Sequence, residues 1–321
     1  KNLQKDNLWI MYLLHHQICV YMKILITGGS GFIGTRLYKL LKDKFHTTIF
    51  DIHQPVESEA NFILGSIHDE QKLSESIQGK DIVIHLAAAV GVKNTEDNPV
   101  TTLDTNIIGT KKILESCAKH KIKKIIFASS SEVYGEPKKI PIDESQIPMP
   151  ITTYGISKLA GEEYVRTFAK TYDFKFSILR FFNAVGPRQS LQFVLSEFIH
   201  NALNDKPIVI HGTGLQIRAF CYVDDICQGI ENSISKGNNE LFNIGNDSEP
   251  ISIENLAKKV KSVLNSKSEI KFVPFNVSGR NREVEILSRV PNINKAKKLL
   301  SYEPKFDLEH SIRSISASMK D

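Results

Sequence analysis

The residues with the clearest chemical potential are Tyr154 and Lys158, which stand four positions apart. On a helix this spacing places both side chains on one face, one turn apart. A phenol has a pKa of about 10, so it is a weak base at neutral pH, and a neighbouring ammonium group stabilises its anion. Lowering that pKa by about three units requires roughly 4 kcal/mol of differential stabilisation. The pair is therefore a candidate general base with its activating cation, although ordinary helix surfaces also carry this spacing.

A glycine-rich segment near the start of the chain has the composition of a phosphate-binding loop. Residues 23–26 form a short apolar run that predicts a buried strand, and residues 27–34, TGGSGFIG, lead into an amphipathic segment. Strand, glycine turn and helix are the context in which backbone N–H groups bind a dinucleotide pyrophosphate. Gly28 permits the tight turn, Gly31 the approach of the pyrophosphate, and Gly34 the close packing of helix and strand. The expected cofactor contacts in this loop are Gly28, Ser30, Gly31, Phe32, Ile33 and Gly34.

An acidic residue follows the second predicted strand and bears on the choice of cofactor. Residues 46–50 form this strand, and Asp51 comes directly after it. A carboxylate in this position accepts hydrogen bonds from the adenosine ribose hydroxyls and repels a 2′-phosphate. No arginine stands beside Asp51 in the sequence. We therefore expect NAD rather than NADP as the cofactor.

Predicted strands and helices continue to alternate along the first half of the chain. Further strands are expected at residues 61–64, 81–86 and 123–127. This alternation indicates an α/β protein with a Rossmann-type doubly wound parallel sheet. Ligands bind at the carboxyl ends of such strands, so we expect Ser130 near Tyr154. The cofactor contacts expected after the third and fourth strands are Ile67, Leu86, Ala87 and Ala88.

The composition excludes several other classes of protein. The chain has 321 residues, of which 41% are hydrophobic and 24% charged, as in globular proteins with a substantial core. The net charge of +5 is scattered and does not indicate nucleic-acid binding. Four cysteines match no zinc pattern, so we expect no metal and a cytoplasmic location. Residues 1–21 hold an apolar stretch too short to span a membrane, and we expect an extension outside a fold that begins at Met22.

Several further motifs follow the glycine loop in a definite order. They are HLAA at 85–88, Asn106 before Gly109 and Thr110, SSSEVYG at 129–135, YGISK at 154–158, RFFNAVGPR at 180–188, GTGLQIR at 212–218, YVDD at 222–225 and FNIG at 242–245. Together they resemble the extended short-chain dehydrogenase/reductase family, and within it the NAD-dependent nucleotide-sugar epimerases and dehydratases. The resemblance runs from Met22 into the C-terminal region.

The resemblance carries expectations for the whole architecture. Residues 22–180, with a return segment at about 219–246, would form an NAD-binding Rossmann domain. Residues 181–218 and 247–321 would form a smaller α/β domain that binds a nucleotide-diphosphate sugar. The family also implies a homodimer, through the helices expected around residues 104–119 and 154–172.

The resemblance also assigns roles to individual residues. Tyr154 would remove the proton from a sugar hydroxyl, usually the one on C4, while Ser130 hydrogen-bonds that hydroxyl and Lys158 holds the nicotinamide ribose. Asn106 would be a further cofactor contact, and Ser66 departs from the aspartate that the family usually has beside the adenine. The residues expected to bind substrate are Ser130, Asn183, Arg188, Arg218 and Arg282. Arg218 is the clearest candidate for the diphosphate, because a guanidinium matches two phosphate oxygens.

Glu132 bears on the fate of the 4-keto sugar that C4 oxidation produces. The 4,6-dehydratases of the family use an Asp-Glu pair in this loop, whereas this chain has Ser131 and Glu132, which makes elimination the less favoured outcome. We expect a C4 epimerase with Glu132 in its catalytic site. A UDP-glucuronate-type decarboxylase is the alternative, because those enzymes also carry Ser-Glu here. A non-catalytic NAD-binding sensor is a different class, and the retained Tyr154 and Lys158 argue against it.

Overall fold

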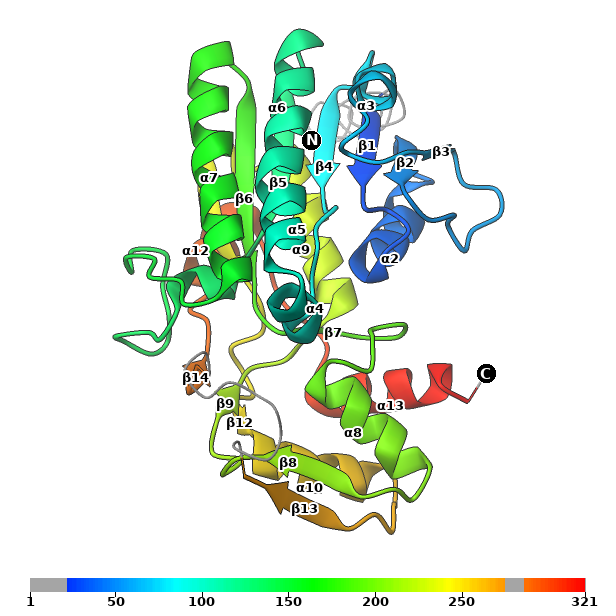
Figure 1. Ribbon diagram of the computed structural model, residues 1–321, viewed down its shortest axis with the longest axis vertical. Helices are drawn as coiled ribbons and strands as arrows, with labels where there is room; N and C mark the ends of the chain where they lie inside the picture. The colour runs from blue at the N-terminus through cyan, green and yellow to red at the C-terminus, as the bar shows by residue number, and fades with distance from the viewer. Residues whose placement is uncertain (1–21, 275–285, 321) are drawn as a thin grey trace, which may run out of the picture.

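The computed structural model describes residues 22–274 and 286–320, without the side chains of residues 92–94. The predicted extension at residues 1–21 lies outside this range. Figure 1 shows a large sheet between two layers of helices and a smaller group of elements beyond one end of it. Within the described ranges, no helix is long and apolar enough to cross a membrane.

The large sheet has seven parallel strands in the order β11-β6-β5-β4-β1-β2-β3, so the predicted doubly wound sheet is confirmed. Its central strands are short apolar runs rich in β-branched residues and buried on both faces, as parallel strands usually are. The strands are β1 (Lys23–Thr27), β2 (His46–Asp51), β3 (Phe62–Leu64), β4 (Ile82–His85), β5 (Lys124–Ser130), β6 (Lys175–Phe181) and β11 (Glu240–Ile244).

Two hydrophobic clusters lie between the sheet and its helices, one on each face. One cluster joins the sheet to α2 (Phe32–Leu41), α9 (Val223–Ser235) and α12 (Asn294–Leu300). The other joins it to α3 (Glu70–Ile77), α6 (Gly109–Lys119) and α7 (Thr153–Tyr172). The short elements between the strands are α4 (Val92–Asp97), α5 (Pro99–Leu103), the π-helix η1 (Asp104–Ile108) and the 3₁₀ turn η2 (Ser131–Tyr134).

The smaller group of elements has a hydrophobic core of its own. Three helices supply most of it: α8 (Val194–Leu203), α10 (Ile253–Val263) and α13 (Leu308–Ser318). They pack with small sheets that Figure 1 shows beyond the carboxyl ends of the large sheet. Their strands are β7 (Ala184–Val185), β8 (Ile208–His211), β9 (Ile217–Arg218), β10 (Cys221–Tyr222), β12 (Ile251–Ser252), β13 (Ile270–Val273) and β14 (Ser288–Arg289).

The contact between α7 and β5 is especially close. A Cβ added at Gly161 on α7 would lie 2.5 Å from Cζ of Phe127, a fully buried residue of β5. The missing side chain therefore allows the helix to lie directly on the strand. This packing brings the first turns of α7, which carry Tyr154 and Lys158, to the carboxyl end of β5.

We predict that Gly161→Ala destabilises the protein, because the new methyl group forces Phe127 or the helix to move. Overpacking of this kind costs about 1–3 kcal/mol, and urea unfolding measures it. As a control, Lys170→Ala changes an exposed residue of the same helix and should alter the free energy of unfolding by less than about 0.5 kcal/mol. Equal stability of the two variants would contradict the close contact.

Candidate active site

The glycine loop between β1 and α2 has the geometry of an anion cradle. Gly28 has φ +73°, and a Cβ there would lie 2.6 Å from the backbone nitrogen of Ala87. A Cβ on Gly34 would collide with the carbonyl oxygen of Gly28. In the part of the chain that the structure describes, no side chain caps the start of α2 at Gly31, which leaves its first backbone N–H groups to a ligand. These features fit the pyrophosphate of a dinucleotide.

Asp51, at the end of β2, lies beside this loop. One carboxylate oxygen accepts a hydrogen bond from the backbone N–H of Ser30 at 3.0 Å, and the other accepts one from that of His53 at 2.9 Å. The hydroxyl of Ser30 donates to the carbonyl of His53 at 2.7 Å. Asp51 is thus held at the mouth of the glycine loop, as a carboxylate that binds ribose hydroxyls must be.

The segment after β4 forms another side of the expected cofactor site, and Asn106 holds it in place. The backbone N–H of Leu86 donates to the carbonyl of Thr27 at 3.0 Å, which ties the segment to the glycine loop. The buried amide of Asn106 accepts from the N–H of Ala89 at 2.8 Å, and donates to the Ala89 carbonyl at 3.1 Å and to the Ser157 hydroxyl at 3.0 Å. Asn106 therefore joins this segment to α7. Ile67 is buried against Gly109, at the start of α6.

The start of α7 brings the predicted reactive residues together. Thr152 caps the helix, accepting a hydrogen bond from the N–H of Gly155 at 2.9 Å. The Lys158 nitrogen lies 5.7 Å from the centre of the Tyr154 ring and donates to the carbonyl of Ala128 at 2.9 Å. Ser130, at the end of β5, lies close enough to the Tyr154 phenol to oppose the rise of its pKa. These three side chains form one group at the carboxyl end of the sheet.

Burial of this group disfavours the phenolate form of Tyr154 unless positive charge lies close to the phenol. Burial and the nearby charge of Glu132 raise the pKa of Tyr154 above its ordinary value, while Ser130 and Arg289 oppose that rise. Burial also lowers the pKa of Lys158 to about 8. Tyr154 therefore depends on positive charge close to its ring to act as a base near neutral pH.

Glu132 forms an ion pair that the sequence did not reveal. One of its oxygens accepts from the Thr152 hydroxyl at 2.8 Å, and the other lies 3.2 Å from Nη1 of Arg289. The Glu132 and Arg289 side chains are only 12% and 15% exposed. Among the described residues, Nε of Arg289 is buried without a hydrogen-bond partner. Local sequence does not single out Arg289, because its pairing with Glu132 joins residues 157 positions apart.

The predicted substrate residues lie in different places. Arg218, on β9, is the register neighbour of Arg289 on β14, and its Nη1 donates to the carbonyl of Ile217 at 2.9 Å. Asn183 uses its amide to donate to the carbonyl of Ala219 at 3.0 Å, beside β10. Arg188 is exposed, with φ 70°. Arg282 lies outside the described residues.

Arg188 is separated from the Glu132–Arg289 pair. A hydrogen bond from Lys39 lowers the pKa of Glu57, in the loop between β2 and β3, and the charge of Arg188 acts in the same direction. In Figure 1 the segment between β7 and α8 extends toward α2, away from β9 and β14. The structure therefore brings Arg218 and Arg289 together and places Arg188 on the side of the glycine loop.

We predict that Asp51→Asn weakens NAD binding by about ten- to hundredfold, because hydrogen bonds to a charged group contribute about 1.5–3 kcal/mol. Removing the charge also relieves repulsion of a 2′-phosphate, so the preference for NAD over NADP should narrow. Calorimetric titration with both cofactors measures this. Asp173→Asn, at the exposed far end of α7, should leave both affinities unchanged. An unaltered preference in Asp51→Asn would remove Asp51 as the discriminating residue.

Comparison with known proteins places these features in a family. A protein of Methanocaldococcus jannaschii provisionally named UDP-glucose 4-epimerase is 36% identical over 310 residues, which cover 93% of this chain and 98% of the relative. A UDP-N-acetyl-alpha-D-glucosaminuronate decarboxylase of Bacillus cytotoxicus is 33% identical over 91% of this chain and 95% of its own. The crystal structure of UDP-glucuronic acid 4-epimerase from Bacillus cereus, in complex with UDP-glucuronic acid and NAD, is 31% identical with a TM-score of 0.85, over 93% of this chain and 99% of its own.

The family itself follows from a match that spans the site. The sequence model described as the NAD dependent epimerase/dehydratase family matches residues 24–245, which include the glycine loop, Asp51, Ser130, Tyr154 and Lys158. The predicted cofactor, NAD, and the prediction of an enzyme rather than a sensor are both confirmed. The chain belongs to the NAD-dependent epimerase/dehydratase family.

Proposed function

We propose that this protein is a C4 epimerase of a nucleotide-diphosphate sugar. The observation that carries the proposal is the convergence of Tyr154, Ser130 and Lys158 at the carboxyl end of β5. The proposal places the sugar at this group. The nucleotide diphosphate extends toward Arg218 and the smaller core built from α8, α10 and α13.

Each of the three side chains has a definite part in C4 oxidation. Tyr154 takes the proton of the C4 hydroxyl, and Ser130 holds that hydroxyl by a hydrogen bond. Lys158 supplies the cation that stabilises the phenolate. A bound NAD would supply the hydride acceptor for oxidation at C4 and the hydride donor for the later reduction. Return of the hydride to the opposite face of the 4-keto sugar inverts C4, and this outcome requires no further acid or base.

The loop after β5 favours this outcome over elimination. Ser131 is buried and carries no carboxyl group, so the acid of the dehydratase pair is missing. Glu132 is held by Thr152 and Arg289. A 4,6-dehydratase needs both an acid and a base beside C5 and C6, and this loop offers one carboxylate that is already paired.

A second candidate function is decarboxylation of a nucleotide hexuronate, and the Glu132–Arg289 pair is the observation that favours it. A largely buried guanidinium whose Nε has no hydrogen-bond partner among the described residues suits an anionic substrate group. Arg289 lies close enough to Tyr154 to oppose the rise of its pKa, which places it near C4 and its neighbours in this proposal. Oxidation of C4 in a hexuronate produces a β-keto acid, which loses carbon dioxide readily. Reduction of the resulting ketone completes the reaction.

Product analysis distinguishes these candidates. The purified protein is incubated with UDP-glucose, UDP-N-acetylglucosamine and UDP-glucuronate, and the products are identified by NMR. A C4-inverted sugar supports the epimerase. Release of carbon dioxide from UDP-glucuronate overturns it in favour of the decarboxylase. Failure to convert any nucleotide sugar while NAD remains bound contradicts both.

We predict that Tyr154→Phe lowers activity by orders of magnitude while the fold and NAD binding are retained, because only the phenolic oxygen is lost. Turnover assays, circular dichroism and NAD titration measure the three properties. Tyr172→Phe, at the exposed end of the same helix, should behave like the unaltered protein. An active Tyr154→Phe variant would remove Tyr154 as the base.

We predict that Arg289→Gln lowers kcat/KM for UDP-glucuronate more than kcat/KM for UDP-glucose. If a hexuronate carboxylate binds Arg289, kcat/KM for UDP-glucuronate should fall by about ten- to hundredfold, the loss expected for a hydrogen bond between charged groups. With UDP-glucose, kcat/KM should fall much less. Arg313→Gln, on the exposed surface of α13, is the matched control. Equal losses with both sugars would mean that Arg289 has no carboxylate to bind.

The proposal includes a homodimer in the cytoplasm. Support for the dimer comes from exposed apolar side chains on η1 and α7, such as Ile108 and Ile156. The described cysteines, Cys117, Cys221 and Cys227, are buried free thiols, as is usual in a reducing compartment. Light scattering on the purified protein tests the dimer.

A further inference from the structure

A fully buried carboxylate lies one helical turn beyond Lys158. Glu162 is on α7 and is 0% exposed. Its Oε1 accepts from the Ser129 hydroxyl at 2.6 Å and from Nε of Arg180 at 2.8 Å, and its Oε2 accepts from Nη2 of Arg180 at 2.7 Å. Nη2 of Arg166 approaches Oε2 at 3.5 Å. These donors hold Glu162 in one position.

Glu162 continues a series of contacts between α7 and β5. Tyr154, Lys158 and Glu162 follow one another at intervals of four residues, which place them on one face of the helix. Their partners on β5 are Ser130, the carbonyl of Ala128 and the Ser129 hydroxyl, which are consecutive residues of one strand. The carboxylate is therefore attached to the same strand end as the reactive group.

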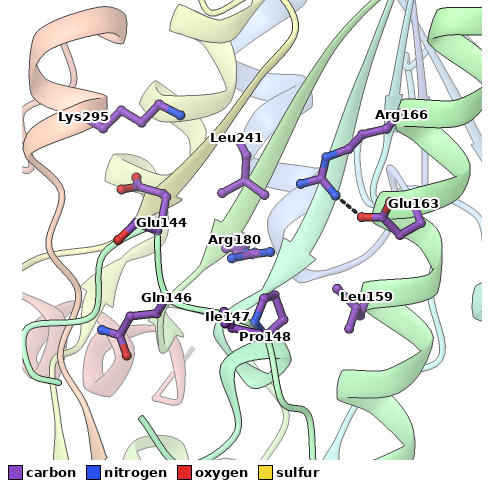
Figure 2. Close-up of a pocket in the computed structure, with 11 residues that line it drawn as sticks. Glu144, Gln146, Ile147, Pro148, Leu159, Glu163, Arg166, Arg180, Leu241 and Lys295 are labelled. Atoms are coloured by element: carbon purple, nitrogen blue, oxygen red, sulfur yellow. Dashed lines mark hydrogen bonds and ion pairs between the residues drawn. The ribbon is translucent and has the colours of Figure 1, made fainter. Parts of the chain in front are cut away.

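Arg180, on β6, holds Glu162 with two hydrogen bonds. Its guanidinium lies 4.5 Å from the centre of the Tyr134 ring, and Tyr134 donates to Oδ1 of Asn243 at 2.7 Å. Figure 2 shows Arg180 among the residues that line a cavity of about 320 Å³, together with the ion pair of Arg166 and Glu163. Because Glu162 is shielded from water by these groups, its charge is screened little by salt.

In the described part of the chain, the titratable groups near Lys158 include Glu162, His85 and Tyr154. Burial lowers its pKa to about 8, and Glu162 acts in the opposite direction. On β4, His85 hydrogen-bonds Thr27 and Thr110 and stays neutral, because burial lowers its pKa to about 3. Tyr154 is the neighbouring titratable group on the same helix. Glu162 is thus a negative charge that favours the protonated form of Lys158.

We propose that Glu162 is a positioning residue for C4 oxidation, which holds the end of β5 through Ser129 and keeps Lys158 in its cationic form. Glu162 acts through Lys158 and does not touch the substrate. The activity part of this inference rests on the proposed function, whereas the effect on Lys158 does not.

The test is the pH dependence of kcat/KM in Glu162→Gln. Lys158 loses its proton near pH 8, and the charge of Glu162 opposes that loss. Without this charge Lys158 becomes neutral at lower pH, so the alkaline limb of the profile should move to lower pH, with kcat/KM at pH 8 reduced by about tenfold. Glu162→Asp keeps the charge and should restore most of the alkaline limb. If the Glu162→Gln variant folds and the alkaline limb of its kcat/KM profile stays at the same pH as in the unaltered protein, the proposal is overturned.

Two controls separate this effect from a loss of structure. Glu162→Gln leaves Arg180 as a buried cation without its partner, which lowers the stability of the variant. The double variant Glu162→Gln with Arg180→Met removes both charges and should regain stability while the alkaline limb stays displaced. A double variant with the unaltered profile would show that Glu162 serves only to balance Arg180. Glu163→Gln changes the exposed neighbour and should leave the profile unchanged.

A second measurement is independent of turnover. The protonation of Lys158 is followed by ¹³C NMR titration of its side chain in the NAD-bound protein, with the resonance assigned through Lys158→Arg. A lower pKa of Lys158 in Glu162→Gln than in the unaltered protein supports the proposal, even if no nucleotide sugar is turned over and the proposed function fails. Identical titration curves overturn it.

Discussion

The close packing of α7 on β5 is the constraint on which the candidate active site depends. Gly161 carries no side chain, so the helix lies directly against Phe127. Because the helix is this close, side chains on its inner face reach the end of the strand rather than solvent. Tyr154 and Lys158 become neighbours of Ser130 for this reason. The chemistry of the site is thus a consequence of one helix–strand contact.

The cofactor end of the site has a more local origin. The glycine loop, the uncapped start of α2 and Asp51 all come from one strand–helix–strand segment. Neighbouring elements mainly prevent the loop from changing shape: Ala87 blocks any side chain at Gly28, and Asn106 ties the segment after β4 to α7. A phosphate site of this kind needs little beyond correct local conformation, because backbone N–H groups do the binding.

The residues that bear on the product come from distant parts of the chain. Glu132 and Arg289 are 157 positions apart and meet where β14 lies beside β9. Thr152, which caps α7, holds the same carboxylate. The ion pair is therefore attached both to the reactive helix and to the smaller group of elements. A charge pair in this location connects the recognition of a substrate group to the loop next to the base.

The sequence by itself determined the doubly wound sheet, the NAD loop, Asp51 and the spacing of Tyr154 and Lys158. These features depend on local periodicity, turn chemistry and the fixed geometry of a helix. Only the tertiary structure decided which charged groups are buried and which partners they meet. Glu162 and Glu163 are adjacent and identical in type, yet their side chains are 0% and 64% exposed. Burial depends on which face of α7 packs against β5. Contacts between distant parts of the chain determine that face, and the local sequence does not specify them.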